Sequence, residues 1–520
     1  MRFSGPSGLL THPAVADPLR VLFVTTECTP FAQTGGLGDV SAALPVALHA
    51  RGFLPSVVMP LYRSVDRARI EPTHKAVSVP VGGARVMGRV WRSSLPGGVP
   101  LYLIEQDGYF DRDGVYGPND EAYPDNLDRF VFLSRASLEV ARLFQIQPDV
   151  VHANDWPTAL IPLLLSEVEP SSSLFGVASL LTIHNVAYQG VFPIRAFEVT
   201  GLGRDKLHER SLEHFGTINL LKAGILGATR LTTVSRRYAQ EIQQGAFGCG
   251  LDGVIRQRGE DLSGVLNGID TDAWNPATDG NLPARFRVGD LSGKAICKAE
   301  LQREAGLPVR ADVPLFGLVT RLTWQKGIDV LAQALGRVLE LDLQLVLLGM
   351  GDHEAEAFFR RVSADRPDKI HAWIGFDHRL AHRIEAGCDF FVMPSRYEPC
   401  GLNQMYSMRY GTLPLVRATG GLDDTVDNYD EATGDGTGFK LYDLNPGSLF
   451  DLIGWAVSTW FDRPRHVAWM RDRAMRRDFS WDRAAARYGE IYWEAARSTG
   501  RVPWSRDMGA LLERRTGTRG

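Results

Sequence analysis

A single carboxylate in the first of two glycine-containing loops is the first candidate for chemistry in this sequence. Glu398 stands between Tyr397 and Pro399 in the loop Ser395–Gly401, and a second glycine turn follows at Ala418–Gly421. Each loop precedes a predicted helix, whose free N–H groups and positive dipole end attract an anion. A diphosphate held beside a fixed carboxylate predicts the transfer of a sugar from a nucleotide. The alternative is that Glu398 is a solvated turn residue and that the glycine loops are those of any α/β protein.

Two buried strands must position these loops. The apolar runs Asp389–Pro394 and Thr412–Arg417 have the length and the continuous hydrophobicity of parallel strands inside a sheet. Each run is followed by a segment of helical composition, over Leu402–Tyr410 and from Leu422 onward. In an open α/β sheet both loops emerge at the carboxyl edge of the strands, where ligands bind.

The same alternation of strands and helices extends along most of the chain. The other predicted strands are Leu19–Thr25, Ser56–Met59, Lys75–Val81, Val86–Trp91, Pro100–Ile104, Asp149–His152, Ala178–Ile183, Pro314–Thr320, Leu343–Leu348 and His371–Ile374. The main predicted helices start near Asp39 and cover Leu127–Leu143, Ile328–Leu341 and Trp481–Ala496. This rhythm predicts parallel βαβ units.

The composition is that of an ordinary globular protein. The chain has 520 residues, of which 44% are hydrophobic and 23% are charged, and its formal net charge is −4. One hydrophobic core rarely grows past about 250–300 residues, so two or more domains are expected. A nearly neutral chain gives no support for non-specific binding to nucleic acid or to a membrane surface.

The cysteines and the N-terminal residues indicate a cytoplasmic protein. The five cysteines are scattered and form no CxxC pair, which favours reduced thiols over a disulfide framework or a zinc cluster. The N-terminal residues contain no apolar run of the length that a secretory signal needs, and no later segment reaches the length of a membrane span.

The domain boundaries are predicted from shifts in composition and pattern. Residues 1–18 are expected to be a flexible leader, 19–265 a first Rossmann-like domain and 266–480 a second one that binds a nucleotide sugar, with the hinge near Gly264–Asp270. Residues 481–500 are expected to form a helix that packs back on the first domain, and 501–520 a disordered tail. The sequence Thr-Gly-Gly-Leu occurs once in each domain, at 34–37 and 419–422, which favours two similar sheets that face each other.

Several motifs resemble those of bacterial glycogen synthases and plant starch synthases. They are QTGGLGD, HANDW, HNVAYQG, VLNGID, TRLTWQKG, PSRYEPCGLNQ and YGTLPLVRATGGLDDTV, in the order and approximate spacing of that family over about residues 20–495. The resemblance implies the GT-B fold, an α/β architecture of two Rossmann-like domains facing across a cleft. It also implies a retaining glycosyltransferase that moves glucose from ADP-glucose to the non-reducing end of an α-1,4-glucan, with no metal and no other cofactor.

Four residues are predicted to carry the catalysis that this resemblance implies. Glu398 matches the carboxylate of the EPCGL motif, and it is a nucleophile, an electrostatic stabiliser or a positioner of the sugar. Breaking the anomeric bond gives an oxocarbenium-like sugar and a diphosphate, whose developing charge needs fixed cations. Arg321 and Lys326 lie on one strand-to-helix loop and fit that role. His184 is expected near the reacting carbon of the donor glucose, although a histidine at a strand end is often structural.

Other motif residues are expected to bind the substrates. Asp155 is a candidate for sugar hydroxyls, with a helix cap before Trp156 as the alternative. Asn267 is a candidate for the nucleotide side, with an Asn-Gly turn as the alternative, and Cys400 is expected to be a small packed residue beside Glu398. Backbone N–H groups of the two glycine loops are expected to hold diphosphate or sugar oxygens. The predicted binding set is Gln33, Gly35, Gly36, Asp39, Asp155, Asn185, Asn267, Cys400, Gly401, Leu402, Thr419, Gly420 and Gly421.

One departure from the family pattern leaves alternatives open. The family usually has a lysine where this chain has Gln33, and an amide lacks the positive charge. The alternatives are therefore a catalytically weakened glucan-binding or regulatory relative, or a synthase that prefers another donor. A phosphorylase-like transferase would need pyridoxal phosphate, for which the sequence gives no support. The expected partners are ADP-glucose or UDP-glucose and a glycogen or maltooligosaccharide acceptor, and the oligomeric state stays open.

Overall fold

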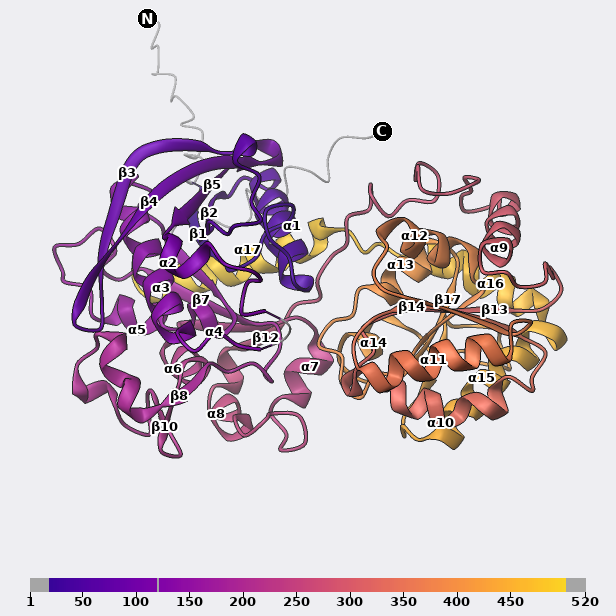
Figure 1. The fold of residues 1–520 in the computed structure, drawn as a ribbon. Helices are drawn as coiled ribbons and strands as arrows, with labels where there is room; N and C mark the ends of the chain where they lie inside the picture. Colours follow the sequence, from indigo (N-terminus) through magenta and orange to yellow (C-terminus); the bar gives the residue numbers. More distant parts are fainter. Residues whose placement is uncertain (1–17, 119–120, 502–520) are drawn as a thin grey trace, which may run out of the picture.

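The first domain is built on a mostly parallel sheet in which the order of the strands reverses next to the first strand. The computed structural model describes residues 18–118 and 121–501 (Figure 1). The nine-stranded sheet has the order β12-β11-β7-β6-β1-β2-β5-β4-β3, and the strand order reverses between β1 and β6. Its strands are β1 (Arg20–Val24), β2 (Leu54–Pro60), β3 (Glu71–Val81), β4 (Ala84–Leu95), β5 (Val99–Glu105), β6 (Val150–Asn154), β7 (Ala178–Ile183), β11 (Arg230–Thr233) and β12 (Leu262–Gly264).

The remaining elements of this domain are helices and one small sheet. β3 and β4 form a long antiparallel ribbon at the edge of the main sheet, and β8 (Val191–Pro193), β10 (Thr217–Asn219) and β9 (Glu213–His214) form a separate three-stranded sheet. The helices are α1 (Gly36–Ala50), α2 (Asp107–Phe110), α3 (Asn126–Leu143), α4 (Asp155–Thr158), α5 (Ile161–Ser166), α6 (Leu220–Gly227), α7 (Arg236–Glu241) and α8 (Asp252–Gln257).

The second domain has the same α/β architecture, with a wholly parallel sheet of six strands. Its order is β15-β14-β13-β16-β17-β18, so the strand order reverses between β13 and β16. The strands are β13 (Leu315–Val319), β14 (Gln344–Gly349), β15 (Ile370–Ile374), β16 (Phe390–Met393), β17 (Leu413–Arg417) and β18 (Phe439–Leu441). The helices are α9 (Ser292–Glu304), α10 (Ile328–Val338), α11 (His353–Asp365), α12 (His378–Gly387), α13 (Asn403–Arg409), α14 (Gly420–Thr425), α15 (Pro446–Asp462) and α16 (Pro464–Met475).

The helix after β1 begins earlier than its sequence predicts. The apolar periodicity places the start near Asp39, whereas α1 begins at Gly36. Gly35 precedes it in an extended conformation, with φ −156°, and two further glycines lie in the first turn. Glycine is a poor helix former by propensity, so tertiary contacts decide this start. Pro45 lies inside the helix and is buried.

Two linkers join the domains and run side by side. The first follows β12 and leads to α9, and the second lies between α16 and the helix α17 (Trp481–Ser498). Ile269 in the first linker pairs with Ser480 in the second, and its N–H donates to the Phe479 oxygen at 2.8 Å. A Cβ atom at Gly268 would lie 2.6 Å from the Cα of Trp481, so the two backbones touch here. Only glycine allows this approach.

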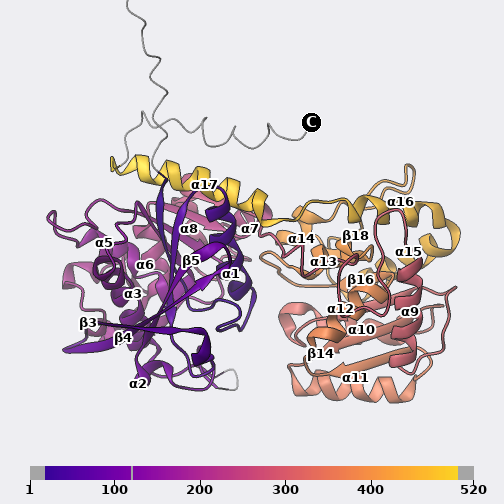
Figure 2. The same ribbon diagram turned by 90° about the horizontal axis from the view of Figure 1, so that it is seen from above.

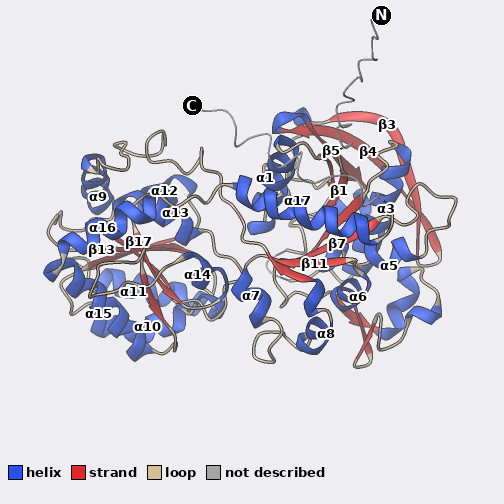
Figure 3. Ribbon diagram, turned by 180° about the vertical axis from the view of Figure 1, so that it is seen from behind, coloured by secondary structure: helices blue, strands red, loops and turns tan. Residues whose placement is uncertain are grey.

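The last of the described helices returns to the first domain. After the second linker, α17 (Trp481–Ser498) lies along the first domain, next to α1 (Figures 2 and 3). Arg51 at the end of α1 forms an ion pair of 2.7 Å with Asp482. Tyr492 reaches the sheet, where its hydroxyl contacts Nδ1 of the buried His152 at 2.7 Å.

The prediction of two Rossmann-like α/β domains is confirmed. The leader and most of the tail expected from the sequence lie outside the described residues. No helix in the described part of the chain has the length and hydropathy to cross a membrane. The five cysteines are free thiols, and four of them are buried. Within residues 18–118 and 121–501, no group of three or more His, Cys, Asp or Glu side chains is placed to hold a metal ion.

Candidate active site

The loops that follow β13 and β16 bring a lysine and a glutamate into direct contact. These strands are neighbours where the strand order reverses, which is where open α/β sheets bind ligands. Lys326 ends a short 3-10 helix (Trp324–Lys326), and its Nζ lies 2.6 Å from Oε2 of Glu398. Ser395 donates a hydrogen bond of 2.9 Å to the same oxygen. The Glu398 side chain is 8% exposed, so the pair lies in a largely water-excluded place.

The guanidinium of Arg321 lies on the same loop as Lys326. The residue is exposed, and in the described ranges no hydrogen bond or ion pair ties its guanidinium to another group. Burial raises the pKa of Tyr397, and the positive charge of Arg321 opposes that rise. Arg321 therefore lies near the residue that precedes Glu398. The three predicted groups come together at one edge of the second sheet.

The residues after Glu398 pack against the first linker. The sulfur of the buried Cys400 accepts a hydrogen bond from the backbone N–H of Asn267. Burial raises the pKa of Cys400 to about 12, which keeps the thiol protonated. Oδ1 of Asn267 is buried and has no hydrogen-bond partner among the described residues. An unpartnered amide oxygen beside the Glu398 loop is suited to accept a hydrogen bond from a ligand.

The second glycine turn gives its N–H groups to partners within the protein. Gly420 donates to both carboxylate oxygens of Glu241, at 3.2 and 3.1 Å, and the Thr419 hydroxyl contacts the same carboxylate. Gly421 donates to the backbone oxygen of Glu398 at 3.0 Å. Contact of this turn with a diphosphate therefore requires an exchange of partners, and that role stays a prediction.

Three predicted residues of the first domain form one hydrogen-bonded group at the ends of β6 and β7. Asp155 has φ +55°, and its Oδ1 accepts the backbone N–H groups of His184 at 2.7 Å and of Asn185 at 3.4 Å. Nε2 of His184 lies 2.9 Å from Oδ1 of Asn154. The Asp155 side chain thus fixes the loop after β7, which delivers His184 and Asn185 to the carboxyl edge of the sheet.

Burial sets the charge states in this group. It raises the pKa of Asp155 to about 7, although the N–H groups of His184 and Asn185 oppose the rise. It lowers the pKa of His184 to about 3. The imidazole is therefore neutral at pH 7 and acts as a hydrogen-bonding group rather than as a cation.

A buried glutamate holds the glycine loop after β1. Oε2 of Glu27 accepts the N–H groups of Thr34 at 2.6 Å and of Gly35 at 3.0 Å. Its Oε1 accepts the hydroxyl of Tyr116 at 2.9 Å. As in the second glycine turn, a carboxylate of the first domain occupies N–H groups at or just before the start of a helix. Both Thr-Gly-Gly-Leu turns are therefore held by protein carboxylates.

Gln33 lies across this loop and contacts Asp39. Its Nε2 donates to Oδ2 of Asp39 at 3.1 Å and to the Gly35 oxygen at 3.3 Å. Burial raises the pKa of Asp39, and the hydrogen bond from Gln33 opposes the rise. A Cβ atom at Gly36 would lie 4.0 Å from the side chain of Leu402. The loop with Gln33 therefore faces the Glu398 loop from the other domain.

Some residues that shape the site were not predicted from the sequence. Glu27 and Ser395 closely follow the strands β1 and β16. Because functional groups often follow strand ends, their positions in the sequence could have indicated both. Glu241 is the last residue of a six-residue helix, and no local pattern marks it. Its place in the site depends on the way the two domains meet.

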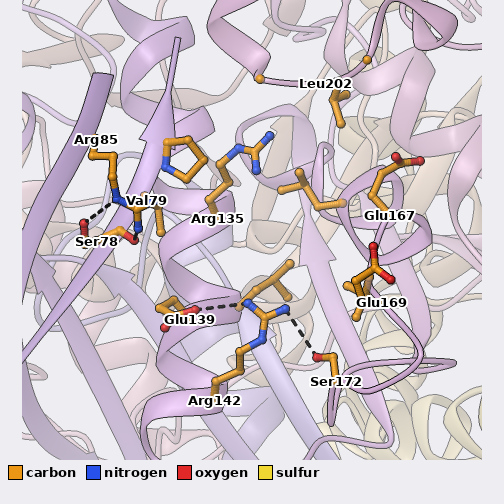
Figure 4. A pocket seen from close by; sticks show the side chains of 16 residues that line it. Ser78, Val79, Arg85, Arg135, Glu139, Arg142, Glu167, Glu169, Ser172 and Leu202 are labelled. Carbon is orange, nitrogen blue, oxygen red and sulfur yellow. Dashed lines mark hydrogen bonds and ion pairs between the residues drawn. The ribbon is translucent and has the colours of Figure 1, made fainter. Parts of the chain in front are cut away.

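A cavity of about 430 Å³ lies elsewhere in the first domain, among β3, α3 and the segment after α5 (Figure 4). Charged side chains line it, and several are paired there. Arg142 forms an ion pair of 3.1 Å with Glu139, and Arg85 donates to the backbone oxygen of Ser78 at 2.7 Å. None of the predicted catalytic or binding residues lines this cavity.

Comparisons with known proteins match nearly the whole chain. Residues 20–257 match the family model described as the starch synthase catalytic domain, and residues 302–465 match the glycosyl transferases group 1 model. A glycogen synthase 1 of Geobacter metallireducens is 48% identical over 485 residues, which are 92% of this chain and 96% of the relative. A glycogen synthase of an Anaeromyxobacter species is 48% identical over 478 residues, 91% of this chain and 99% of the relative.

A solved structure has the same arrangement of domains. It is the catalytic domain of starch synthase IV from Arabidopsis thaliana, bound to ADP and acarbose, with 32% sequence identity and a TM-score of 0.85. The match covers 92% of this chain and 100% of that one.

Proposed function

The chain belongs to the glycogen and starch synthase family of GT-B glycosyltransferases, and from this premise we propose how its two domains transfer glucose. The reaction moves glucose from ADP-glucose to the non-reducing end of an α-1,4-glucan with retention of the anomeric configuration. The observation that carries this proposal is the 2.6 Å contact of Lys326 with Glu398, beside the guanidinium of Arg321, which pairs with no other group among the described residues.

The second domain binds the donor and withdraws charge from its leaving group. As the anomeric bond breaks, negative charge develops on the diphosphate, and prearranged cations in a water-excluded site stabilise it most. Arg321 and Lys326 supply these cations. Donor binding draws Lys326 toward the phosphate and leaves the Glu398 carboxylate next to the sugar, where positive charge develops.

The first domain and the first linker orient the donor glucose. The neutral ring of His184 offers a hydrogen bond to a sugar hydroxyl, and Asp155 fixes the loop that carries it. The buried Oδ1 of Asn267 accepts a hydrogen bond from the donor. These groups hold the glucose in one geometry relative to Glu398, which is the main means by which a transferase lowers the entropic part of the barrier.

A donor-competition assay tests this function. Purified protein is given glycogen and either labelled ADP-glucose or labelled UDP-glucose, and label in the polymer is followed before and after digestion with an α-1,4-specific amylase. We expect incorporation from ADP-glucose in the larger amount, released by the amylase. Binding to glycogen without incorporation from either donor would instead support the catalytically weakened relative, for which Gln33 is the specific observation.

A further inference from the structure

Two short helices from different domains cap each other beside the active site. The N–H groups of Arg236 and Arg237, which begin α7, donate to Oδ2 of Asp424 in α14, at 2.5 and 3.0 Å. In return, Glu241 at the end of α7 accepts the N–H of Gly420, which begins α14. Each helix thus supplies the carboxylate that the other helix needs at its N-terminus, where unpaired N–H groups and the positive dipole end lie.

The Glu241 cap is sealed from water, whereas Asp424 lies at the surface. The side chain of Glu241 is 2% exposed. Thr419, which contacts the same carboxylate, is also buried. The nearest opposite charge is Arg237, whose Nε lies 3.2 Å from Glu241. Hydrogen bonds to a buried carboxylate are strong, and leaving one unmade is costly. The contact is therefore a fixed part of the domain junction and not a place for a solvent anion.

The same two helices hold the backbone of the catalytic glutamate. Ser235, the cap residue of α7, donates from its hydroxyl to the backbone oxygen of Pro399 at 2.6 Å. From the other helix, the N–H of Gly421 donates to the backbone oxygens of Glu398 and Pro399, at 3.0 and 3.2 Å. A Cβ atom at Gly420 would lie 1.9 Å from the Glu398 oxygen. The start of α14 and the Glu398 loop are thus in direct contact.

We propose that Glu241 and Ser235 are positioning residues for Glu398. Glu241 fixes the start of α14, Gly421 transmits that position to the Glu398 backbone, and Ser235 holds the next carbonyl. A carboxylate that comes from the second domain is in this way placed relative to the first domain, which carries His184. The inference rests on the proposed function, because it concerns the residue that the proposal places beside the reacting sugar.

The test uses the full-length enzyme with Glu241→Gln. Glutamine keeps the volume but puts an NH₂ group where one oxygen accepts hydrogen bonds, so the start of α14 shifts. A misplacement of about 1 Å near the reacting atoms costs on the order of 100-fold in rate. We expect kcat to fall by about 10- to 100-fold, while the KM for ADP-glucose stays near the wild-type value. The melting temperature falls, because a buried hydrogen bond is lost, but the variant stays folded at the assay temperature. Glu241→Asp, which keeps the carboxylate, should restore part of kcat.

Two further variants keep the test decisive. Ser235→Ala removes one of the three hydrogen bonds to the loop and should lower kcat by less than Glu241→Gln does. Asp252→Asn makes the same acid-to-amide change on the neighbouring helix α8, in a surface ion pair with Arg256, and should leave the kinetics unchanged.

An unchanged kcat in Glu241→Gln, or a loss of kcat that vanishes on cooling because the variant merely unfolds, would overturn the inference while the proposed function stands. A wild-type protein that transfers no glucose would overturn both.

Discussion

At the residue scale, the contact between Lys326 and Glu398 gives the lysine two proposed partners in turn, the carboxylate before the donor binds and the phosphate afterwards. The lysine holds the Glu398 carboxylate in an ion pair before the donor arrives, and in the proposed reaction the same lysine then moves to the phosphate. Arg321 has no partner in the described part of the chain and is available from the start. We therefore expect different roles for the two cations, because Lys326 is paired with Glu398 and Arg321 is exposed.

Removing either member of the pair should nearly abolish transfer. We expect Glu398→Ala and Lys326→Ala each to lower kcat by about 100- to 1,000-fold, the usual loss when one fixed electrostatic group is removed. Steady-state kinetics with ADP-glucose and glycogen measure this. Glu300→Ala is the control, because its ion pair with Arg303 lies on the surface and contributes little. Near-parental rates in both site variants would contradict the assignment.

Gln33→Lys should strengthen donor binding. The glutamine amide already contacts Asp39, so a lysine at this position has a carboxylate partner and adds a positive charge facing the Glu398 loop. A charged hydrogen bond is worth about 1.5–3 kcal/mol, so the KM for ADP-glucose should fall by about tenfold or more. Gln33→Met, of similar length without polar atoms, is the matched control. A KM that is unchanged or raised by lysine would mean that the loop is built around glutamine.

Asp155 should make stability depend on pH. Its pKa rises on folding from about 3.9 to about 7, so the folded protein binds the proton more tightly than the unfolded chain. The stabilisation is complete below about pH 4 and is lost as the pH rises through 7. Asp155→Asn removes the titration, and asparagine tolerates the positive φ. Urea denaturation at pH 4.5, 6 and 7.5 should show that the free energy of unfolding of the wild type falls relative to that of the variant as the pH rises. The same pH dependence in both proteins would contradict a raised pKa for Asp155.

The candidate site was predictable at the residue scale where a group follows a buried strand. Glu398, Lys326 and His184 all do, and strand ends meet at one edge of a sheet. Glu241 was not predictable, because it ends a helix and comes to the site only through a contact between domains. Gly420 was predicted to donate to a ligand, whereas the structure gives its N–H to that same glutamate.

At the element scale, the two linkers form one structural unit, because their backbones are in direct contact. Elements with a strong local signal were predictable, and β7 has the bounds that its apolar run predicts. The short helices α7 and α14, of six residues each, offer less than two turns of periodicity. Their contact with each other, which no local pattern contains, defines them.

Adding one methyl group at Gly268 should disrupt this unit. The new Cβ atom would lie 2.6 Å from the Cα of Trp481, and backbone atoms cannot rotate away. We expect Gly268→Ala to lower the free energy of unfolding by about 1–3 kcal/mol or more and to reduce transfer with it. Denaturant titration measures the first effect. Gly280→Ala, with no atom within 4 Å of the added carbon, should be neutral, and equal stability of the two variants would contradict the contact.

At the scale of the whole molecule, the first domain is completed by α17, the last helix that the structure describes. The buried His152 contacts Tyr492 through Nδ1 and Thr182 through Nε2, so a side chain from α17 completes a hydrogen-bond network inside the first sheet. The amphipathic pattern of Trp481–Ala496 predicts the helix, but the partner of Tyr492 follows only from the three-dimensional fold.

Tyr492→Phe should destabilise the protein without touching the site. It leaves Nδ1 of His152 buried without its partner, at a cost of about 1–3 kcal/mol in the free energy of unfolding. Chemical denaturation followed by tryptophan fluorescence measures the loss. Tyr442→Phe removes a hydroxyl from a residue that is 67% exposed and should change stability little. Equal midpoints for the two variants would show that this hydrogen bond contributes nothing.

The return of α17 also imposes an order on biosynthesis. A ribosome makes Trp481–Ser498 only after the whole second domain, so the nascent first domain waits with the faces of β6 and β7 that this helix covers still open. Its maturation therefore waits for the synthesis of the second domain and of this helix. A message truncated before this helix would yield a polypeptide in which the domain made first is the one left unfinished.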